Sequence, residues 1–595
     1  MRWLAHFCLA AAPLVSLAQK APPPRPAAPL AIYTDIVSGP NSGGDDGKGI
    51  YLSVFGKNFG STCLGTATKV FIGGVEVAGY RTLGPSRGRQ DIQQITVQVG
   101  ALGNPQPGVA LPIKVVVDGR ESDTNLSFTV NPGTIYFVSL TGNDGTGVPG
   151  AIANPYRTVQ KDGPANNGVG GISNPTAPCA VAGGIQPVAS VGVWGLIQPG
   201  DFIVMRGGTW TDVSKLGNFL VVQNKSGTLP TGAAGSGPIT VMGYPGENVF
   251  INRTNPGGNQ GGSGITSADS ARQANGCGAR VTITNVKVES GFNDGMISTQ
   301  RGADNPAGSH WRVVNNEMTA VSCQNNTKCK GAGVAGSGAG GFWVGNHVHD
   351  VYDKPDAQTS FENLGFYVDG VGSYEIAYNR IENIYGGNGV QLYSTSTPIT
   401  NNASIHHNVI RNVGKHGINL ADGAEAGIAV YNNVVLDTGV AGLRINSRDL
   451  TGARIYNNTF FNTDRLNAGG ARAALMNDWN LRPGAAEIRN NVFAPGGAGR
   501  NYLGGSVGFG ALAATMSNNL WFGGRGAVAG SGNVIADPKF ISTAAGSENF
   551  RGQAASPAID AGSATVAPLV GNDFDCSTRR PQGREFDIGA YEAAK

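Results

Sequence analysis

An asparagine recurs through the second half of the chain, each time inside a unit of the form apolar-x-x-Asn-x-apolar. Successive copies lie 30, 33, 29, 25, 25, 33 and 28 residues apart, a period that indicates a solenoid and not a compact domain. The repeats are too short for helices plus strands and show no 3.6-residue apolar period, so each turn is predicted to contain only strands and bends. Asparagine tolerates a left-handed bend, and stacked amides can hydrogen-bond between turns, which predicts a structural column. Its members are Asn316, Asn346, Asn379, Asn408, Asn433, Asn458, Asn491 and Asn519.

Composition supports an all-β reading. Of 595 residues 92 are glycine, only 14% are charged, and the net charge of +3 argues against nucleic acid as the main partner.

Residues 1–18 have the basic start, short apolar run and small-residue site of a signal peptide, which predicts export. Residues 19–29 form a Pro-rich linker. No later apolar run is long enough to span a bilayer, so a secreted, periplasmic or cell-surface monomer without a transmembrane segment is expected.

Residues 30–132 contain short alternating strands separated by Gly, Asn and Pro turns, which predicts a β-sandwich. The stretches "GKNFG", "VFIGGVEV" and "FTVNPG" resemble an IPT/TIG domain, an immunoglobulin-like module. The resemblance implies a spacing or binding role. The segment contains no histidine, and its acidic residues form no pattern that chemistry would need.

The segment that follows, with "TIYFVSLTGNDGTG", "IQPGDFIVMRGGTW" and "GPITVMGYPGENVFI", resembles the opening turns of secreted pectate lyase-like proteins. The expected fold class is therefore all-β, an immunoglobulin-like sandwich followed by a right-handed parallel β-helix over residues 133–555. Residues 556–595 resemble the choice-of-anchor Q segment of exported β-helix proteins. Its charged residues would form either a catalytic cluster or a cap, and a cap is favoured because a solenoid must close its last apolar turn. These residues are Arg580, Arg584, Asp587 and Glu592.

The outer face of the solenoid is the place where function is expected, since apolar side chains fill the interior. Aligning "GFYVDG", "GVQLYS", "GINLAD" and "GLRINS" predicts two outward columns with successive members about 4.8 Å apart. Aromatic, amide and guanidinium groups at that pitch suit an extended carbohydrate. The first column is Tyr367, Gln391, Asn419 and Arg444, and the second is Asp369, Tyr393, Ala421 and Asn446. The margin is Leu364, Asn388, His416 and Ala441, with Lys415 one residue further back.

Two mechanisms are compatible with these residues. In β-elimination of a uronate polymer a base removes the proton α to a carboxylate and a cation neutralises that carboxylate. Lys415 or His416 would be the base and Arg444 the neutraliser, with Tyr393 and Asp369 completing the catalytic set. The resemblance implies this option, because β-helix lyases generally use Lys or Arg with a cation such as calcium beside it.

A calcium ion is an alternative neutraliser, held by Asp353, Asp356 and Asp369. Hydrolysis is the second mechanism, which needs two carboxyl groups, with Asp369, Asp422 and Glu425 as candidates. A third hypothesis is a non-catalytic adhesion protein that only binds glycans. Tyr367, Asn388, Gln391, Asn419 and Asn446 are the predicted substrate-binding residues.

Several other polar residues are predicted to be structural. Asp350 follows a column asparagine by four residues, a position that recurs as Asn383, Asn412, Asp437 and Asn462. His406 and His407 flank column residue Asn408. Six cysteines remain after signal cleavage, and Cys323 with Cys329 is the expected local disulfide, favoured over a metal site.

Overall fold

The computed structural model describes 27–61, 64–160, 192–212, 218–222, 226–253, 263–267, 279–290, 296–298, 310–320, 331–336, 340–351, 363–369, 372–393, 402–421, 423, 426–466, 472–481, 485–576, 578 and 580–593. The predicted signal peptide, most of the linker and the Cys323–Cys329 pair lie outside these residues. Cys576 is described. It is buried and forms no disulfide with another described residue. Within the described ranges no helix is long and apolar enough to cross a membrane.

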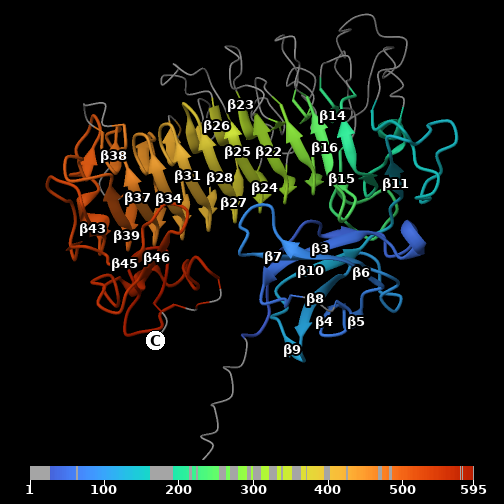
Figure 1. The fold of residues 1–595 in the computed structure, drawn as a ribbon, viewed down its shortest axis with the longest axis horizontal. Helices are drawn as coiled ribbons and strands as arrows, with labels where there is room; N and C mark the ends of the chain where they lie inside the picture. Colours follow the sequence, from blue (N-terminus) through green and yellow to red (C-terminus); the bar gives the residue numbers. More distant parts are fainter. Residues whose placement is uncertain are drawn as a thin grey trace, which may run out of the picture.

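A parallel β-helix makes up most of the molecule (Figure 1). Three sheets run along it, and the chain passes from sheet 1 to sheet 2 to sheet 3 in each turn. Stacked apolar side chains fill the interior, as in the row Ile376, Ile405 and Val430, none of which is exposed. The predicted all-β fold class is confirmed.

Sheet 1 contains β11 (Ile135–Val138), β12 (Phe202–Met205), β15 (Ile239–Gly243), β18 (Val281–Thr284), β21 (Trp311–Val314), β24 (Gly340–Val344), β27 (Ser373–Ala377), β30 (Ser404–His406), β33 (Ala429–Tyr431), β36 (Ala453–Tyr456), β39 (Ala486–Arg489) and β42 (Met516–Ser517). Sheet 2 contains β13 (Gly208–Trp210), β16 (Val249–Asn252), β19 (Lys287–Glu289), β22 (Glu317–Ala320), β25 (His347–Val351), β28 (Arg380–Ile384), β31 (Val409–Val413), β34 (Val434–Thr438), β37 (Thr459–Thr463), β40 (Val492–Pro495), β43 (Leu520–Trp521) and β44 (Val534–Ile535). Sheet 3 contains β14 (Leu220–Val222), β17 (Ile265–Ser267), β20 (Ile297–Ser298), β23 (Gly331–Gly336), β26 (Asn363–Asp369), β29 (Asn388–Tyr393), β32 (Ile418–Ala421), β35 (Leu443–Asn446), β38 (Leu475–Asn477) and β41 (Leu503–Gly504). A short helix, α1 (Val193–Leu196), precedes β12.

The asparagine column is a continuous hydrogen-bonded ladder at the bend between sheets 1 and 2. Each side-chain Nδ2 donates to Oδ1 of the next asparagine over 2.9–3.2 Å, and all eight residues are fully buried. That Oδ1 also accepts from the backbone N–H of the preceding ladder residue. The predicted ladder is confirmed, and the backbone N–H of Asn519 extends it to Asn533.

The left-handed bend falls one residue earlier than the sequence pattern suggested. The residue before each ladder asparagine has a φ between 51° and 68°, as at Asn315, Tyr378 and His407, whereas the ladder asparagines do not have a positive φ. The ladder position therefore needs a side-chain amide, which both donates and accepts hydrogen bonds. It does not need a residue that tolerates the left-handed bend. His406 and His407 are buried beside this bend, in agreement with their predicted structural role.

A second ladder runs along sheet 2, four residues after the first. Asp350, Asn383, Asn412, Asp437 and Asn462 all have φ between 50° and 58°, which places the same left-handed residue in each strand. The Nδ2 of Asn383 donates to Asp350 Oδ1 over 2.8 Å, and Nδ2 of Asn412 donates to Asn383 Oδ1 over 2.7 Å. The structural role predicted for Asp350 is confirmed.

The N-terminal domain is a sandwich of two mainly antiparallel sheets that share one apolar core. It packs under the first part of the solenoid, and its core is continuous with Phe202, Val204 and Met242 on the outer face of sheet 1 (Figure 1). The domain is therefore fixed to the solenoid. One sheet contains β1 (Leu30–Thr34), β3 (Tyr51–Lys57), β7 (Gln93–Gln98) and β6 (Gly79–Pro85). The other contains β2 (Ser38–Gly39), β10 (Ser127–Val130), β8 (Ala110–Val117), β4 (Thr68–Ile72), β5 (Val75–Glu76) and β9 (Arg120–Glu121).

The C-terminal segment lies along the flank of the solenoid and not over its last turn (Figure 1). The parallel strands end at Ile535, and a hairpin of β45 (Phe540–Ser542) and β46 (Asn549–Gly552) packs Phe540 and Phe550 against Phe461 of sheet 2. Phe509, Leu512, Val528 and Ala529 instead pack against the core at the final turn. The predicted capping of the last apolar turn by residues 556–595 is therefore corrected to a flank-covering role.

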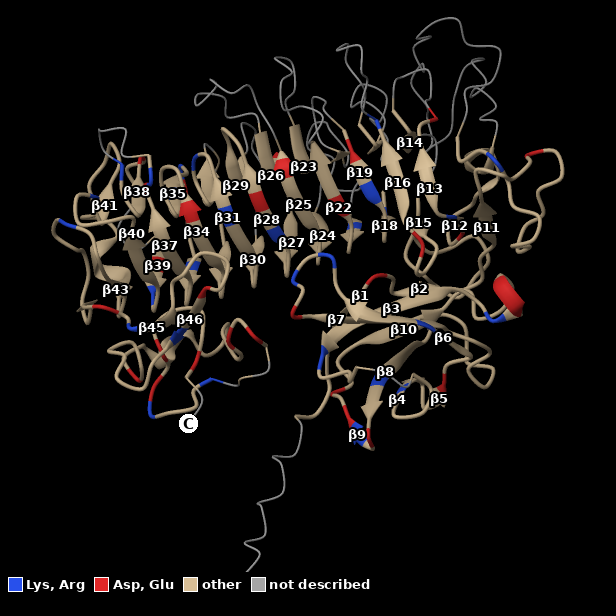
Figure 2. Ribbon diagram, in the orientation of Figure 1, with Lys and Arg blue, Asp and Glu red and all other residues tan. Residues whose placement is uncertain are grey.

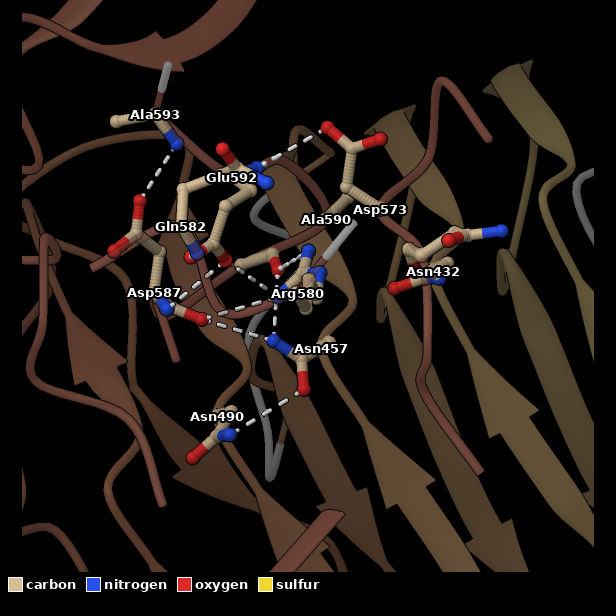
Figure 3. A network of polar contacts seen from close by, with 12 residues as sticks. Asn432, Asn457, Asn490, Asp573, Arg580, Gln582, Asp587, Ala590, Glu592 and Ala593 are labelled. Atoms are coloured by element: carbon tan, nitrogen blue, oxygen red, sulfur yellow. Dashed lines mark hydrogen bonds and ion pairs between the residues drawn. The ribbon is translucent and has the colours of Figure 1, made fainter. Parts of the chain in front are cut away.

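The buried cluster of the C-terminal segment is a joint between that segment and the solenoid (Figure 3). The guanidinium of Arg580 donates to the carbonyls of Asp587 and Gly589 over 3.2 and 2.9 Å and lies 3.6 Å from a Glu592 carboxylate oxygen. Asn457, in the bend of the solenoid, donates to the same carbonyl of Asp587 over 2.9 Å. These contacts support the structural reading of the cluster; Arg584 is exposed.

The sandwich and the C-terminal segment also touch each other. Arg89 of the sandwich donates to the Phe574 carbonyl over 2.5 Å, and its guanidinium lies 3.6 Å from the centroid of that ring. Tyr33 stacks on Tyr378 of the solenoid, which stacks on His407. The sandwich and the C-terminal segment therefore meet over sheet 1.

Candidate functional site

The outward columns predicted on sheet 3 are present in the strand register. Tyr367 pairs with Gln391, Gln391 with Asn419, and Asn419 with Arg444. Asp369, Tyr393, Ala421 and Asn446 pair in the same way. The residues between them are fully buried in the core: Phe366, Val368, Val390, Leu392, Ile418, Leu420, Leu443 and Ile445. Charged residues of both signs are scattered over the molecule and form no single basic stripe (Figure 2).

The middle of the first column and Asn388 of the margin are buried, which differs from the expected outward face. Asn388, Gln391 and Asn419 are 0, 7 and 1% exposed. The amides of Asn388 and Asn419 both donate to Gln391 Oε1, over 2.7 and 3.0 Å, so they position one another. Asn419 Oδ1 is buried and has no hydrogen-bond partner among the described residues. It is the one acceptor of this relay left for a ligand.

Lys415 and His416 lie in the turn between β31 and β32 and are also buried, at 7 and 4% exposed. The N–H of His416 donates to Asn388 Oδ1 over 3.0 Å, which joins the turn to the amide relay. Burial lowers the pKa of His416 to about 3, and the charges of Arg444 and Lys415 act in the same direction. His416 is therefore a neutral imidazole, and its buried Nδ1 has no partner within the described part of the chain.

Two residues of the next turn complete this cluster, and the sequence pattern did not identify them. Asp478 accepts from Nε of Arg444 over 2.7 Å and from the N–H of Ser506 over 2.7 Å. Burial raises the pKa of Asp478, but these hydrogen bonds outweigh burial and hold that pKa below its usual value. Arg472 is near enough to lower the pKa of His416, and its buried Nη1 has no described partner.

The described side chains around His416 are mostly basic. The charges of Arg444, Lys415 and Arg472 lower the pKa of His416, and among the described residues the carboxylate of Asp478, hydrogen-bonded to Arg444, acts against them. We call these five residues the cationic cluster. Arg472 is partly buried, and its buried Nη1, which has no partner among the described residues, favours an anionic group beside it.

The two column tyrosines lie on the preceding turns. The ring centroids of Tyr367 and Tyr393 are 6.2 Å apart, and both side chains are partly exposed. Tyr367 also packs against Ala332, Ala335 and Leu364, so this end of the face is apolar. The face thus passes from aromatic and apolar to cationic along the solenoid axis.

The predicted calcium ligands Asp353 and Asp356 lie outside the described residues, as do the predicted hydrolytic residues Asp422 and Glu425. Asp369 is described and partly exposed. Among the described residues, no three or more histidine, cysteine, aspartate or glutamate side chains group to hold a metal ion. Calcium binding remains a prediction.

The comparison with known families matches part of the solenoid. Residues 263–460 match the family model described as right handed beta helix region. This span includes both columns and Lys415, His416 and Arg444, and it ends before Arg472 and Asp478. No curated protein matches the chain.

Proposed function

We propose that this protein is an exported carbohydrate-active protein that binds an acidic polysaccharide along sheet 3 and cleaves it by β-elimination. The cationic cluster is the observation that carries the proposal, because a uronate carboxylate would accept from the buried Nη1 of Arg472, which has no partner among the described residues. The parallel β-helix supports a carbohydrate-active role in general, since its stacked strands present side chains at a regular pitch. Export and a monomeric state belong to the same proposal.

Each residue of the site has a role in this proposal. Tyr367 and Tyr393 stack on sugar rings, and the relay of Asn388, Gln391 and Asn419 holds the turn that carries Lys415. Asn446, beside Arg444 in β35, hydrogen-bonds sugar hydroxyls.

The chemistry takes place at the cationic cluster. Lys415, as the neutral amine, takes the proton from the carbon α to the carboxylate, and Arg444 and Arg472 stabilise the enolate that develops. The bond between the sugar carbon and the glycosidic oxygen then breaks, a 4,5 double bond forms in the sugar, and the leaving oxygen takes a proton from water. His416 donates or accepts a hydrogen bond as a neutral imidazole, because a pKa of about 3 makes it a weak base.

Hydrolysis has less support. It needs one carboxylic acid and one carboxylate on either side of the glycosidic bond, about 5–9.5 Å apart. In the described part of the cluster Asp478 is the carboxylate, and Arg444 already holds it ionised. Pure glycan binding is the remaining alternative, and the experiment below separates all three.

The test is a screen of uronate polymers with the purified protein, with and without a chelator. β-Elimination gives products with the ultraviolet absorbance of the new double bond, hydrolysis gives reducing ends without it, and binding alone gives neither. We expect Lys415→Ala to abolish the absorbance change and to keep the fold. Lys114→Ala, which removes a surface lysine paired with Glu121 in the sandwich, is the matched control and should keep full activity. Undiminished turnover by the Lys415→Ala protein would reject Lys415 as the base.

A further inference from the structure

A cavity lies between the sandwich and sheet 1, on another face of the molecule than the cationic cluster. Its volume is about 290 Å³. Its floor consists of residues in, or one position before, the consecutive sheet 1 strands β18, β21, β24 and β27. Val37 of the sandwich and Leu229, Pro230 and Pro238 of the solenoid contribute apolar walls. The cavity is distinct from the cationic cluster, which lies on sheet 3.

Basic groups gather on the floor of this cavity. Arg280 and His310 each occupy the position just before a strand, β18 and β21, and Arg312 pairs with Phe342 of the next strand. Neighbouring strands lie about 4.8 Å apart, so these groups follow one another closely along the solenoid. None of the residues that line the cavity is acidic.

Burial and the charge of Arg280 lower the pKa of His310, so the cations of this cavity are Arg280 and Arg312. Within the described part of the chain, the side chains of Arg280 and His310 make no hydrogen bond or ion pair. Arg312 donates only to the sandwich carbonyls of Thr34 and Asp35, over 2.7 and 3.2 Å, and its guanidinium lies 4.0 Å from the Phe342 ring centroid. Burial lowers the pKa of Arg312 to about 10, against the opposing charges of Asp35 and Glu375. A buried cation held by carbonyls is stabilised when an anion binds beside it.

Resting on the proposed function, we propose that this cavity binds an acidic sugar residue, with its carboxylate at Arg280 and Arg312, His310 beside it, and its ring against Phe342 and the proline wall. The volume is at the lower end of the range of about 300–1,000 Å³ for ligand pockets, which suits one or two sugar rings and not a long chain segment. The sandwich contributes Val37 and the carbonyls that orient Arg312. The N-terminal domain is therefore part of a binding site as well as a packing partner of the solenoid.

The test is the binding of glucuronate and galacturonate to the full-length protein, followed by ligand-observed NMR, with glucose and inorganic sulfate as comparison ligands. The test variant is the double substitution Arg280→Asn and His310→Asn. Both native residues have positive φ, at 52° and 56°, and asparagine tolerates that conformation, so the charge is removed without backbone strain. Arg525→Asn, at an exposed arginine near the other end of the solenoid, is the matched control.

All proteins are compared in the Arg472→Gln background, so that the cationic cluster does not contribute the signal. We expect the double substitution to weaken uronate binding at least tenfold and the control to leave it unchanged. Val37→Trp, checked for an unchanged melting temperature, should weaken binding by filling the cavity. Uronate binding that survives the double substitution within twofold overturns the site. Binding of glucose equal to that of glucuronate, or uronate binding no tighter than that of sulfate, overturns the acidic-sugar assignment.

Discussion

The asparagine ladder predicts a large loss of stability when one member is removed. In Asn433→Ala, the backbone N–H and side-chain Nδ2 of Asn408 lose their shared acceptor, previously 3.1 and 3.0 Å away. The carbonyl of Ile405 and Oδ1 of Asn458 lose the Asn433 donor that approached them at 2.8 and 2.9 Å. Leaving one buried polar group unsatisfied costs about 1–3 kcal/mol. Because Asn408 Nδ2 and Asn458 Oδ1 keep other partners, two groups carry most of the cost, and we expect a loss of about 2–6 kcal/mol.

The assay is urea unfolding followed by circular dichroism, comparing the free energy of unfolding of the variant with that of the native protein. Asn41→Ala is the control, because its amide makes one surface hydrogen bond to the Ala101 carbonyl and should change stability by less than about 1 kcal/mol. A loss for Asn433→Ala no larger than that of the control would refute the view that the ladder is a main source of solenoid stability.

Two further predictions concern stability. The hydrogen bond from His349 lowers the pKa of Glu317 to about 2, below its value of 4.5 when unfolded, so the stability it contributes is present above about pH 4.5 and is lost as the pH falls towards 2. The urea midpoint of unfolding should therefore fall less at acid pH in Glu317→Gln than in the native protein. An unchanged fall at acid pH contradicts the assignment. Arg89→Ala should release the segment around Phe574 and make it sensitive to proteolysis, whereas Arg584→Ala, at an exposed arginine, should not; equal cleavage of both variants would argue against the contact.

The in-register stacking of a parallel solenoid explains why so much of the fold follows from the sequence. Once two strands are aligned by their ladder asparagines, residues such as Gln391 and Asn419 must be neighbours, and the structure pairs them. The sequence pattern predicts on which face of the strand a side chain lies. It does not predict how deeply that side chain is buried by the residues around it. The burial of His416 and its neutral state were therefore not predicted.

Long-range contacts account for the remaining differences. Asp478 and Arg472 come from the next turn, where the step between ladder asparagines is 33 residues and the alignment of short strand motifs was not continued. The flank position of the C-terminal segment depends on contacts such as that of Arg89 with Phe574, which join residues 485 positions apart and leave no local signal.

The central claim is that the cationic cluster recognises the carboxylates of an acidic polysaccharide. Its most direct test is the affinity of a uronate oligosaccharide, and of the same oligosaccharide with its carboxyl groups reduced to alcohols, for the native and Arg472→Gln proteins. A charge-assisted hydrogen bond contributes about 1.5–3 kcal/mol, which corresponds to at least about tenfold in affinity. The account predicts that reduction of the carboxyls weakens binding to the native protein by at least that factor and that Arg472→Gln removes most of this preference. Equal affinity of the native protein for the two oligosaccharides would contradict it.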